Sequence, residues 1–231
     1  KHLLGETSRG YMRMIRAVFF DSDEMEGVYS ELDLSRSGAL GKVKWARKPE
    51  LVAGVDPAFT NGGDRTIMTL AEVGYDDRGQ FVFQIKETFS INDDTTNKAV
   101  PRSYQIVEQI KNICVKNGIK PEYLALDSTG AGGPFCDILA GEWEMGFTRI
   151  VFNGKPSDKR VSLNSSHKAC DLYTNRVSEI WFVGKELIRT KQIYGIPTEL
   201  AQEMCARKYD MTKSSGSLKV ALESKADFKS R

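Results

Sequence analysis

Short apolar runs separated by turn residues begin at Leu51 and continue through the chain. Leu51–Val55, Thr66–Tyr75 and Gln80–Ser90 each have the apolar or alternating character of a β-strand. Asp76–Gly79, of sequence DDRG, is a turn signal between the second and third runs. Because only short connections join the three runs, the pattern predicts an antiparallel meander.

After the meander the pattern changes to alternating helices and strands. Ile106, Ile110 and Ile113 recur at helical spacing, which predicts a helix over 102–117 that Gly118 ends. The other expected elements are a strand over 122–127, a helix over 132–143, a strand over 147–153, helices over 165–191 and 197–206, and a strand over 216–224. This order predicts an α/β fold. We expect a mixed sheet of three antiparallel and then alternating parallel strands, with helices on both faces.

Composition narrows the function classes. The chain has 231 residues, of which 40% are hydrophobic, so it can form a sizeable core. No apolar run reaches the ~20 residues that a membrane helix needs, so no membrane partner is expected. The four cysteines form no Cys-x-x-Cys pair and are expected to be free thiols in a reducing compartment. With only two histidines, a catalytic centre has to rely mainly on carboxylates.

Two aspartates stand at the ends of apolar strands. Asp56 ends the run AGVD, and Asp127 ends the run LALD. If the first and fourth strands are neighbours in the sheet, the two carboxylates meet at the edge where open α/β sheets bind ligands. Two adjacent carboxylates repel each other, and a divalent cation removes the conflict. Oxygen ligands of this kind suit Mg²⁺ or Mn²⁺. Two such ions can activate a water molecule and stabilise the leaving oxygen when a phosphodiester is hydrolysed.

Simpler interpretations remain open for single residues. An Asp after a strand is common as a turn former or helix cap, so either residue alone is ambiguous. Asp64 follows two glycines and is either a third acid of the site or an exposed loop residue. The stretch Ser128–Pro134, of sequence STGAGGP, lacks the Walker pattern; we interpret its glycines as allowing close backbone approach beside the acids. No Walker motif occurs, so ATP hydrolysis by this chain is not expected.

At this point the motifs resemble a family. The order strand–DPA–Gly-rich loop–Asp, then strand–DSTG, resembles the nuclease domain of the large terminase subunits of tailed bacteriophages. Two further segments, NRVSEIW at Asn175–Trp181 and LKVALESKADFKSR at Leu218–Arg231, resemble later motifs of the same family. Each motif is short, and their shared order over 51–231 carries the resemblance.

The resemblance implies an RNase H-like fold and a metal-dependent endonuclease that cuts concatemeric double-stranded viral DNA with two ions of Mg²⁺ or Mn²⁺. Asp56 and Asp127 would be metal ligands, and Asp64 would match an accessory acid of the first loop. The family's third metal ligand lies in a helix after the Glu-Ser-Lys segment. We expect that ligand to lie beyond Arg231, so that 51–231 is a nuclease domain without its last helix.

The resemblance also implies partners. Residues 1–50 would be a connector from a preceding ATPase domain that is absent from this sequence. In the full protein the chain would work with a small terminase subunit and a portal, in the cytoplasm of the host cell.

Charge adds a candidate DNA-binding segment. Residues 152–231 hold 15 Lys/Arg and 9 Asp/Glu, a balance of +6, whereas residues 1–151 hold 18 and 22, a balance of −4. The candidate phosphate contacts are Lys155, Lys159, Arg160, Lys168 and Arg176. Arg176 is alternatively a structural partner of Glu179 or Glu72, and ordinary surface charge is the simpler explanation of the whole imbalance.

Two other functions compete with the terminase nuclease. Another RNase H-like nuclease, of the resolvase or transposase type, would share the acids but not the two later motifs. A domain without catalytic activity that grips DNA or docks on a partner would need no metal. Metal-dependent cleavage and the form of DNA that is cut distinguish these possibilities.

Overall fold

The computed structural model describes residues 26–39, 41–58, 65–161, 165–214 and 217–230 of the chain. These residues form two compact units. The six-stranded unit runs over 41–152 and 192–195, and the three-stranded unit takes the rest of the described chain. Among the described helices, none is long and apolar enough to span a bilayer.

The six-stranded unit is one mixed sheet with two main helices. Its strands, in the order β6-β5-β2-β3-β4-β7, are β6 (Thr148–Ile150), β5 (Leu124–Asp127), β2 (Glu50–Asp56), β3 (Thr66–Tyr75), β4 (Phe81–Ile91) and β7 (Ile193–Tyr194). β3 is antiparallel to both of its neighbours, and the other pairs are parallel. The predicted mixed sheet, a meander followed by parallel strands, is therefore confirmed. β7 was not predicted.

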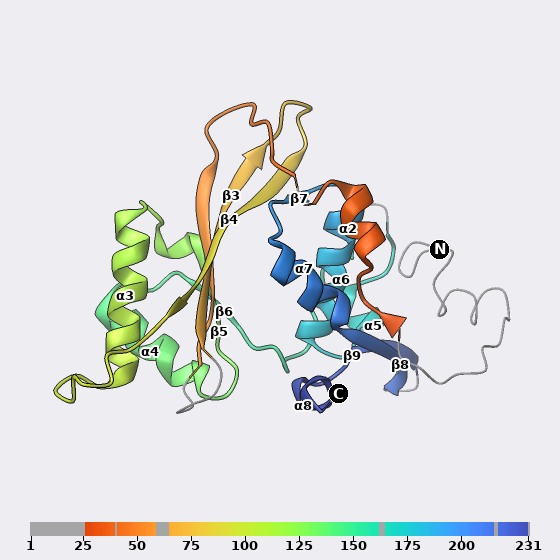
Figure 1. Ribbon diagram of the computed structural model, residues 1–231. Helices are drawn as coiled ribbons and strands as arrows, with labels where there is room; N and C mark the ends of the chain where they lie inside the picture. The colour runs from red at the N-terminus through yellow and green to blue at the C-terminus, as the bar shows by residue number, and fades with distance from the viewer. Residues whose placement is uncertain (1–25, 40, 59–64, 162–164, 215–216, 231) are drawn as a thin grey trace, which may run out of the picture. The chain divides into compact units, whose positions relative to one another are not determined.

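The core of this unit lies on one face of the sheet. Helices α3 (Arg102–Lys116) and α4 (Gly132–Glu142) pack there, as the left side of Figure 1 shows. Ile106, Ile110 and Cys114 form the buried face of α3, as the spacing of its isoleucines predicted. A short 3-10 helix, η1 (Pro121–Tyr123), precedes β5. The parallel strands β2, β5 and β6 end at one edge of the sheet, and Asp56 and Asp127 lie at this edge.

The three-stranded unit combines short strands and helices. Its sheet has the order β1-β8-β9, with β1 (Glu26–Gly27), β8 (Lys208–Ser214) and β9 (Ser217–Leu222). Its helices are α2 (Glu31–Ser37), α5 (Ala169–Leu172), α6 (Arg176–Arg189), α7 (Thr198–Ala206) and α8 (Lys225–Lys229). β1 and α2 show that part of 1–50 is folded. The assignment of 1–50 as a connector stays a prediction.

The single helix predicted over 165–191 is wrong. The chain forms the short α5, leaves the helical conformation at Tyr173, and starts α6 after Asn175. The backbone N–H of Thr174 donates to the carbonyl of Val220 in β9 at 3.0 Å, and Asn175 Oδ1 accepts the N–H of Ser178 at 3.0 Å. Pairing with β9 and an Asn cap together interrupt the helix.

Candidate active site at the carboxyl edge of the sheet

Asp56 and Asp127 lie side by side at the ends of two parallel strands. The register pairs Ala53 with Leu124 and Val55 with Leu126, so the next position on each strand is the aspartate. Side chains alternate between the faces of a sheet, and Val55 and Leu126 are buried in the core. Asp56 and Asp127 therefore share the face opposite that core.

The face that carries the acids is open near Asp56. A Cβ built on Gly54, two residues earlier on the same face, meets no described heavy atom within 4 Å. Asp56 is exposed, and Asp127 is half-buried. Solvent can therefore reach the carboxylate of Asp56.

Thr129 holds the carboxylate of Asp127. Its hydroxyl lies 2.5 Å from Asp127 Oδ1, and its backbone N–H donates to the same oxygen at 2.9 Å. The Thr129 hydroxyl also accepts the N–H of Phe152 at 2.8 Å, just after β6. One threonine thus links the end of β5 to the end of the next strand, and it occupies one oxygen of Asp127. No hydrogen bond to Asp127 Oδ2 occurs within the described residues.

Gly132 fits tightly under the end of β5. A Cβ at this position would lie 2.3 Å from the carbonyl oxygen of Asp127, too close for any side chain. The same Cβ would lie 3.7 Å from Cγ of Pro57, the residue after the other acid. This close approach is what the Gly-rich stretch predicted, and at Gly132 it is confirmed.

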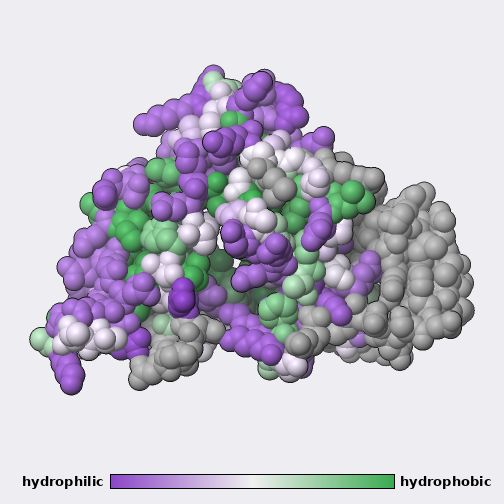
Figure 2. All heavy atoms as spheres, viewed as in Figure 1, coloured by the Kyte–Doolittle hydropathy of each residue, from purple (hydrophilic) through white to green (hydrophobic). Residues whose placement is uncertain are grey.

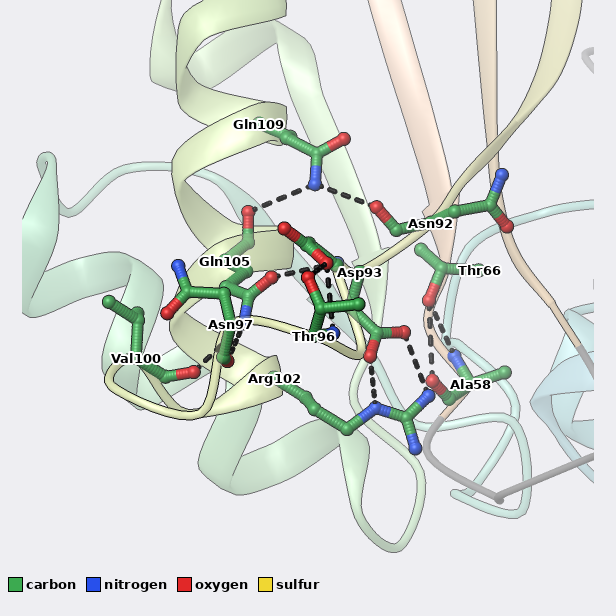
Figure 3. Close-up of polar contacts among 11 residues, drawn as sticks. Ala58, Thr66, Asn92, Asp93, Thr96, Asn97, Val100, Arg102, Gln105 and Gln109 are labelled. Carbon is green, nitrogen blue, oxygen red and sulfur yellow. Dashed lines mark hydrogen bonds and ion pairs between the residues drawn. The ribbon is translucent and has the colours of Figure 1, made fainter.

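The chain after Asp56 is fixed to the first residue of β3. The hydroxyl of Thr66 accepts the N–H of Ala58 at 3.1 Å and lies 3.3 Å from the carbonyl of Ala58 (Figure 3). Thr66 itself is buried. A buried threonine thus sets the direction in which the chain leaves the acid.

The connection from β4 to α3 also lies at this edge of the sheet (Figure 3). The guanidinium of Arg102 contacts Asp93, with Nε 2.6 Å from Oδ2 and Nη2 2.8 Å from Oδ1. This hydrogen bonding lowers the pKa of Asp93 below its usual range. Gln105 and Gln109 of α3 donate to the carbonyls of Val100 and Asn92, at 2.8 and 2.9 Å. This connection is therefore held by several side chains of α3.

The residues of the site fit a divalent cation only in part. Asp56 and Asp127 offer carboxylate oxygens at adjacent positions, which is the donor chemistry that Mg²⁺ and Mn²⁺ prefer. No group of three or more His, Cys, Asp or Glu that could hold a metal is found within the described residues. Asp64 lies outside those residues. Two carboxylates fit as part of a ligand set, and the other ligands stay a prediction.

The predicted basic residues lie in the three-stranded unit. Lys155, Lys159, Arg160 and Lys168 are all exposed. Arg160 and Lys168 face each other in an antiparallel bridge, and the N–H of Ala169 donates to the carbonyl of Lys159 at 2.9 Å. All four therefore lie on one loop, residues 155–168, of which 162–164 are outside the described residues.

Arg176 holds this loop in place. Its Nη1 lies 2.9 Å from Oε2 of the buried Glu179, as one of the two sequence interpretations expected. Glu179 also accepts the backbone N–H of Ser157 at 2.7 Å and the Ser157 hydroxyl. The backbone N–H of Arg176 donates to the carbonyl of Gly154 at 2.8 Å. Arg176 and Glu179, in the first turn of α6, thus bind Gly154 and Ser157 at the start of the loop 155–168.

Two sequence segments that resemble terminase motifs meet at Arg207. Its guanidinium lies 5.6 Å from the ring centre of Trp181, in α6, and 5.3 Å from that of Phe228, in α8. Arg207 Nη2 also donates to the carbonyl of Glu223 at 2.7 Å. The sequence alone did not indicate Arg207 or Thr129. For Thr129, the available signal was the Asp-x-Thr spacing of a turn.

The fold of this chain is similar to that of solved terminase nuclease domains. The nuclease domain of the large terminase subunit gp2 of the bacterial virus Sf6 superposes with a TM-score of 0.57, over 89% of this chain and 91% of that one, at 11% identity. The fold is that of a terminase nuclease domain. At this identity the likeness shows the terminase nuclease fold alone.

Point-substituted forms of the same Sf6 domain give similar results. One solved with calcium has a TM-score of 0.56, and one solved with manganese has a TM-score of 0.53; both cover 89% of this chain and 91% of the other, at 11% identity. No protein-family model matches the sequence. A comparison with curated proteins found no match either.

Proposed function

We propose that this chain is the nuclease domain of a viral DNA-packaging terminase, and that it cuts concatemeric double-stranded DNA in a reaction that needs two divalent metal ions. The observation that carries the proposal is the adjacency of Asp56 and Asp127 on the open face of the sheet. The terminase nuclease fold supports it, as do relatives solved with manganese and with calcium.

In this proposal Asp56 and Asp127 hold Mg²⁺ or Mn²⁺. When bound, such ions lower the pKa of a water molecule and stabilise the negative charge of a phosphodiester in its transition state. Thr129 keeps one oxygen of Asp127 occupied, so Oδ2 is the one left to bind a cation. Asp64 acts as an accessory acid.

The basic loop at 155–168 would contact DNA phosphates. Lys155, Lys159, Arg160 and Lys168 are exposed and can neutralise a polyanion without reading its sequence. Arg176 contributes by fixing the loop through Glu179. In the full protein we place this domain with an ATPase domain, a small terminase subunit and a portal, in the host cytoplasm.

Plasmid cleavage tests the function directly. We expect this chain to cut plasmid DNA with Mn²⁺ or Mg²⁺ and not with EDTA, and we expect Asp56→Asn and Asp127→Asn to abolish cutting while circular dichroism stays unchanged. Asp137→Asn is the matched control, because its exposed carboxylate on α4 pairs with Arg149 of β6 and not with either acid. Full activity of either acid variant would refute the site.

The same assay addresses the competing functions. A packaging nuclease should cut long duplex DNA with little sequence preference, whereas a resolvase or transposase-type enzyme should prefer branched DNA or particular ends. Absence of cutting under every metal, together with DNA binding, would indicate a gripping domain instead.

A further inference from the structure

The end of the six-stranded unit opposite the acids carries a basic surface. Four cations occur in seven residues before β2: Lys42, Lys44, Arg47 and Lys48. The segment that holds them runs beside the β3–β4 hairpin, at the top of Figure 1. The N–H of Ala46 donates to the carbonyl of Tyr75 at 3.0 Å, and that of Asp77 donates to the carbonyl of Lys44 at 2.8 Å. We call these four cations and the hairpin tip the basic hairpin face.

The four cations are available to a partner. All four are exposed, and none forms an ion pair within the described part of the chain. Arg78, by contrast, is paired with Asp76 at 2.8 Å, so this arginine is largely neutralised. The exposed acids on the same segments are Glu50 and Asp77, which leaves an excess of positive charge. In Figure 2 hydrophilic side chains gather over this end of the unit.

The hairpin tip is rigid and apolar beside these charges. Asp76 Oδ1 accepts the N–H groups of Arg78 and Gln80 at 2.9 and 2.8 Å, which fixes the turn. Next to the turn, Tyr75 is 60% exposed and Phe81 is 42% exposed, and their rings meet edge to face at 5.4 Å. A fixed aromatic pair flanked by unpaired cations is a surface suited to a nucleic acid backbone, with phosphates on the cations and sugars on the rings.

The distance from the acids to the hairpin tip can be expressed as a number of base pairs along a DNA duplex. Asp56 is paired with Ile67 on β3, and Tyr75 lies eight residues farther along that strand (75 − 67 = 8). At roughly 3.3 Å per residue this is about 26 Å. Along one strand of B-DNA, at about 3.4 Å per base pair, the same length corresponds to about eight base pairs.

We propose that the basic hairpin face binds the phosphate backbone of double-stranded DNA about eight base pairs from the phosphodiester at Asp56 and Asp127. This inference rests on the proposed nuclease function. It adds a second contact region, separate from the loop at 155–168, that lies on the same unit as the acids. The contact is electrostatic and independent of base sequence.

Salt dependence of DNA binding tests the contact without cleavage. The full chain is titrated in EDTA with a labelled duplex of about three helical turns, over a series of salt concentrations. We expect the variant K42Q/K48Q to bind more weakly and its slope of log K against log salt to fall in magnitude by about 2, since two phosphate contacts are lost. The matched control is K116Q/K120Q, which removes the same charge from two exposed lysines of the same unit and should keep the slope.

The outcomes separate this inference from the nuclease assignment. If K42Q/K48Q keeps the wild-type slope, the basic hairpin face does not bind DNA and an acidic protein surface becomes its better partner, even if plasmid cleavage succeeds. An equal loss of slope in K116Q/K120Q would show a nonspecific charge effect and would also overturn the proposal. If the wild-type chain binds DNA with the expected contrast but never cuts, the face stands and the nuclease function fails.

Discussion

The hydroxyl of Thr129 joins the carboxylate of Asp127, at 2.5 Å, to the backbone that follows the neighbouring strand, at 2.8 Å. In the proposed metal site, a carboxylate that is held in this way would present a defined oxygen to the cation. Groups that orient a metal ligand typically change metal affinity or activity 10–100-fold when they are removed. Under the proposed nuclease function, Thr129 is therefore a positioning residue whose effect the cleavage assay can detect.

Thr129→Val should raise the Mn²⁺ concentration needed for half-maximal cleavage by roughly 10-fold or more. The valine keeps the shape of the side chain and the backbone N–H bond, but it loses the hydroxyl that contacts Asp127. Thr129→Ser restores the hydroxyl and should recover most of the wild-type metal dependence. A shift in thermal stability without any change in metal dependence would show that Thr129 has only a structural role.

Gly132→Ala should displace the backbone of Asp127. The new methyl group would lie 2.3 Å from the Asp127 carbonyl oxygen, so the end of β5 or the start of α4 must move. Overpacking of this kind costs about 1–3 kcal/mol of unfolding free energy, and we expect cleavage to fall with it.

The neighbouring glycine provides the control for that variant. A Cβ at Gly133 would lie 3.7 Å from the carbonyl oxygen of Ser128, which is an ordinary van der Waals contact. Gly133→Ala should leave cleavage intact and change stability by no more than about 1 kcal/mol, in the favourable direction. Urea unfolding of both variants tests this contrast, and similar behaviour of the two would contradict the close-approach argument.

The sequence predicted that Asp56 and Asp127 lie side by side, but it did not predict the threonines that hold the chain around them. Asp56 and Asp127 each end an apolar run, and the element order made β2 and β5 neighbours, as the structure shows. The hydroxyls of Thr129 and Thr66 accept the backbone N–H groups of Phe152 and Ala58, in chain segments that the sequence does not place beside them. Such tertiary contacts leave no periodic signal.

The elements that the sequence did not predict are either too short to show a pattern or depend on contacts between distant parts of the chain. β7 has two residues, and β8, of sequence KYDMTKS, has too few apolar positions to alternate clearly. The break before α6 depends on pairing of Thr174 with β9, 46 residues away. In contrast, α3 was predicted because its buried stripe is local to the helix.

Glu179→Gln should destabilise the three-stranded unit. The buried carboxylate accepts bonds from Arg176 and Ser157, and its loss leaves the guanidinium without its charged partner. We expect a cost of about 1–3 kcal/mol in unfolding free energy and weaker DNA binding, because the loop at 155–168 loses its anchor. Glu186→Gln, which removes a more exposed carboxylate paired with Arg189, should cost at most about 0.5 kcal/mol. Equal losses in the two variants would contradict the anchoring role.

Asp76 should make the β3–β4 hairpin sensitive to acid. Hydrogen bonds from the backbone of Gln80 and from Arg78 lower the pKa of Asp76 below its ordinary value. A lowered folded-state pKa means that the ionised carboxylate stabilises the fold above about pH 4, and that this contribution is lost as the pH falls through the folded-state pKa.

Thermal unfolding of the wild-type chain and of Asp76→Asn measures this effect. The difference in Tm between the two should be largest at neutral pH and should shrink as the pH falls below about 4, where the wild-type carboxylate also becomes neutral. Asp77→Asn, at the exposed neighbouring residue, is the control and should unfold like the wild type. A Tm difference that does not change with pH would mean that the charge of Asp76 is unimportant.

The parallel pairing of β2 with β5 has a consequence for folding kinetics. Ala53 and Leu124 are 71 residues apart in sequence (124 − 53 = 71), whereas β2, β3 and β4 are joined by local hairpins. Closing a long loop costs entropy that only later contacts recover, so distant strand pairs form slowly. The meander can therefore assemble first, while Asp56 still has no partner acid. In a refolding experiment, β-sheet signal should return before the ability to cut DNA, and the delay between them would measure how late the acid pair is completed.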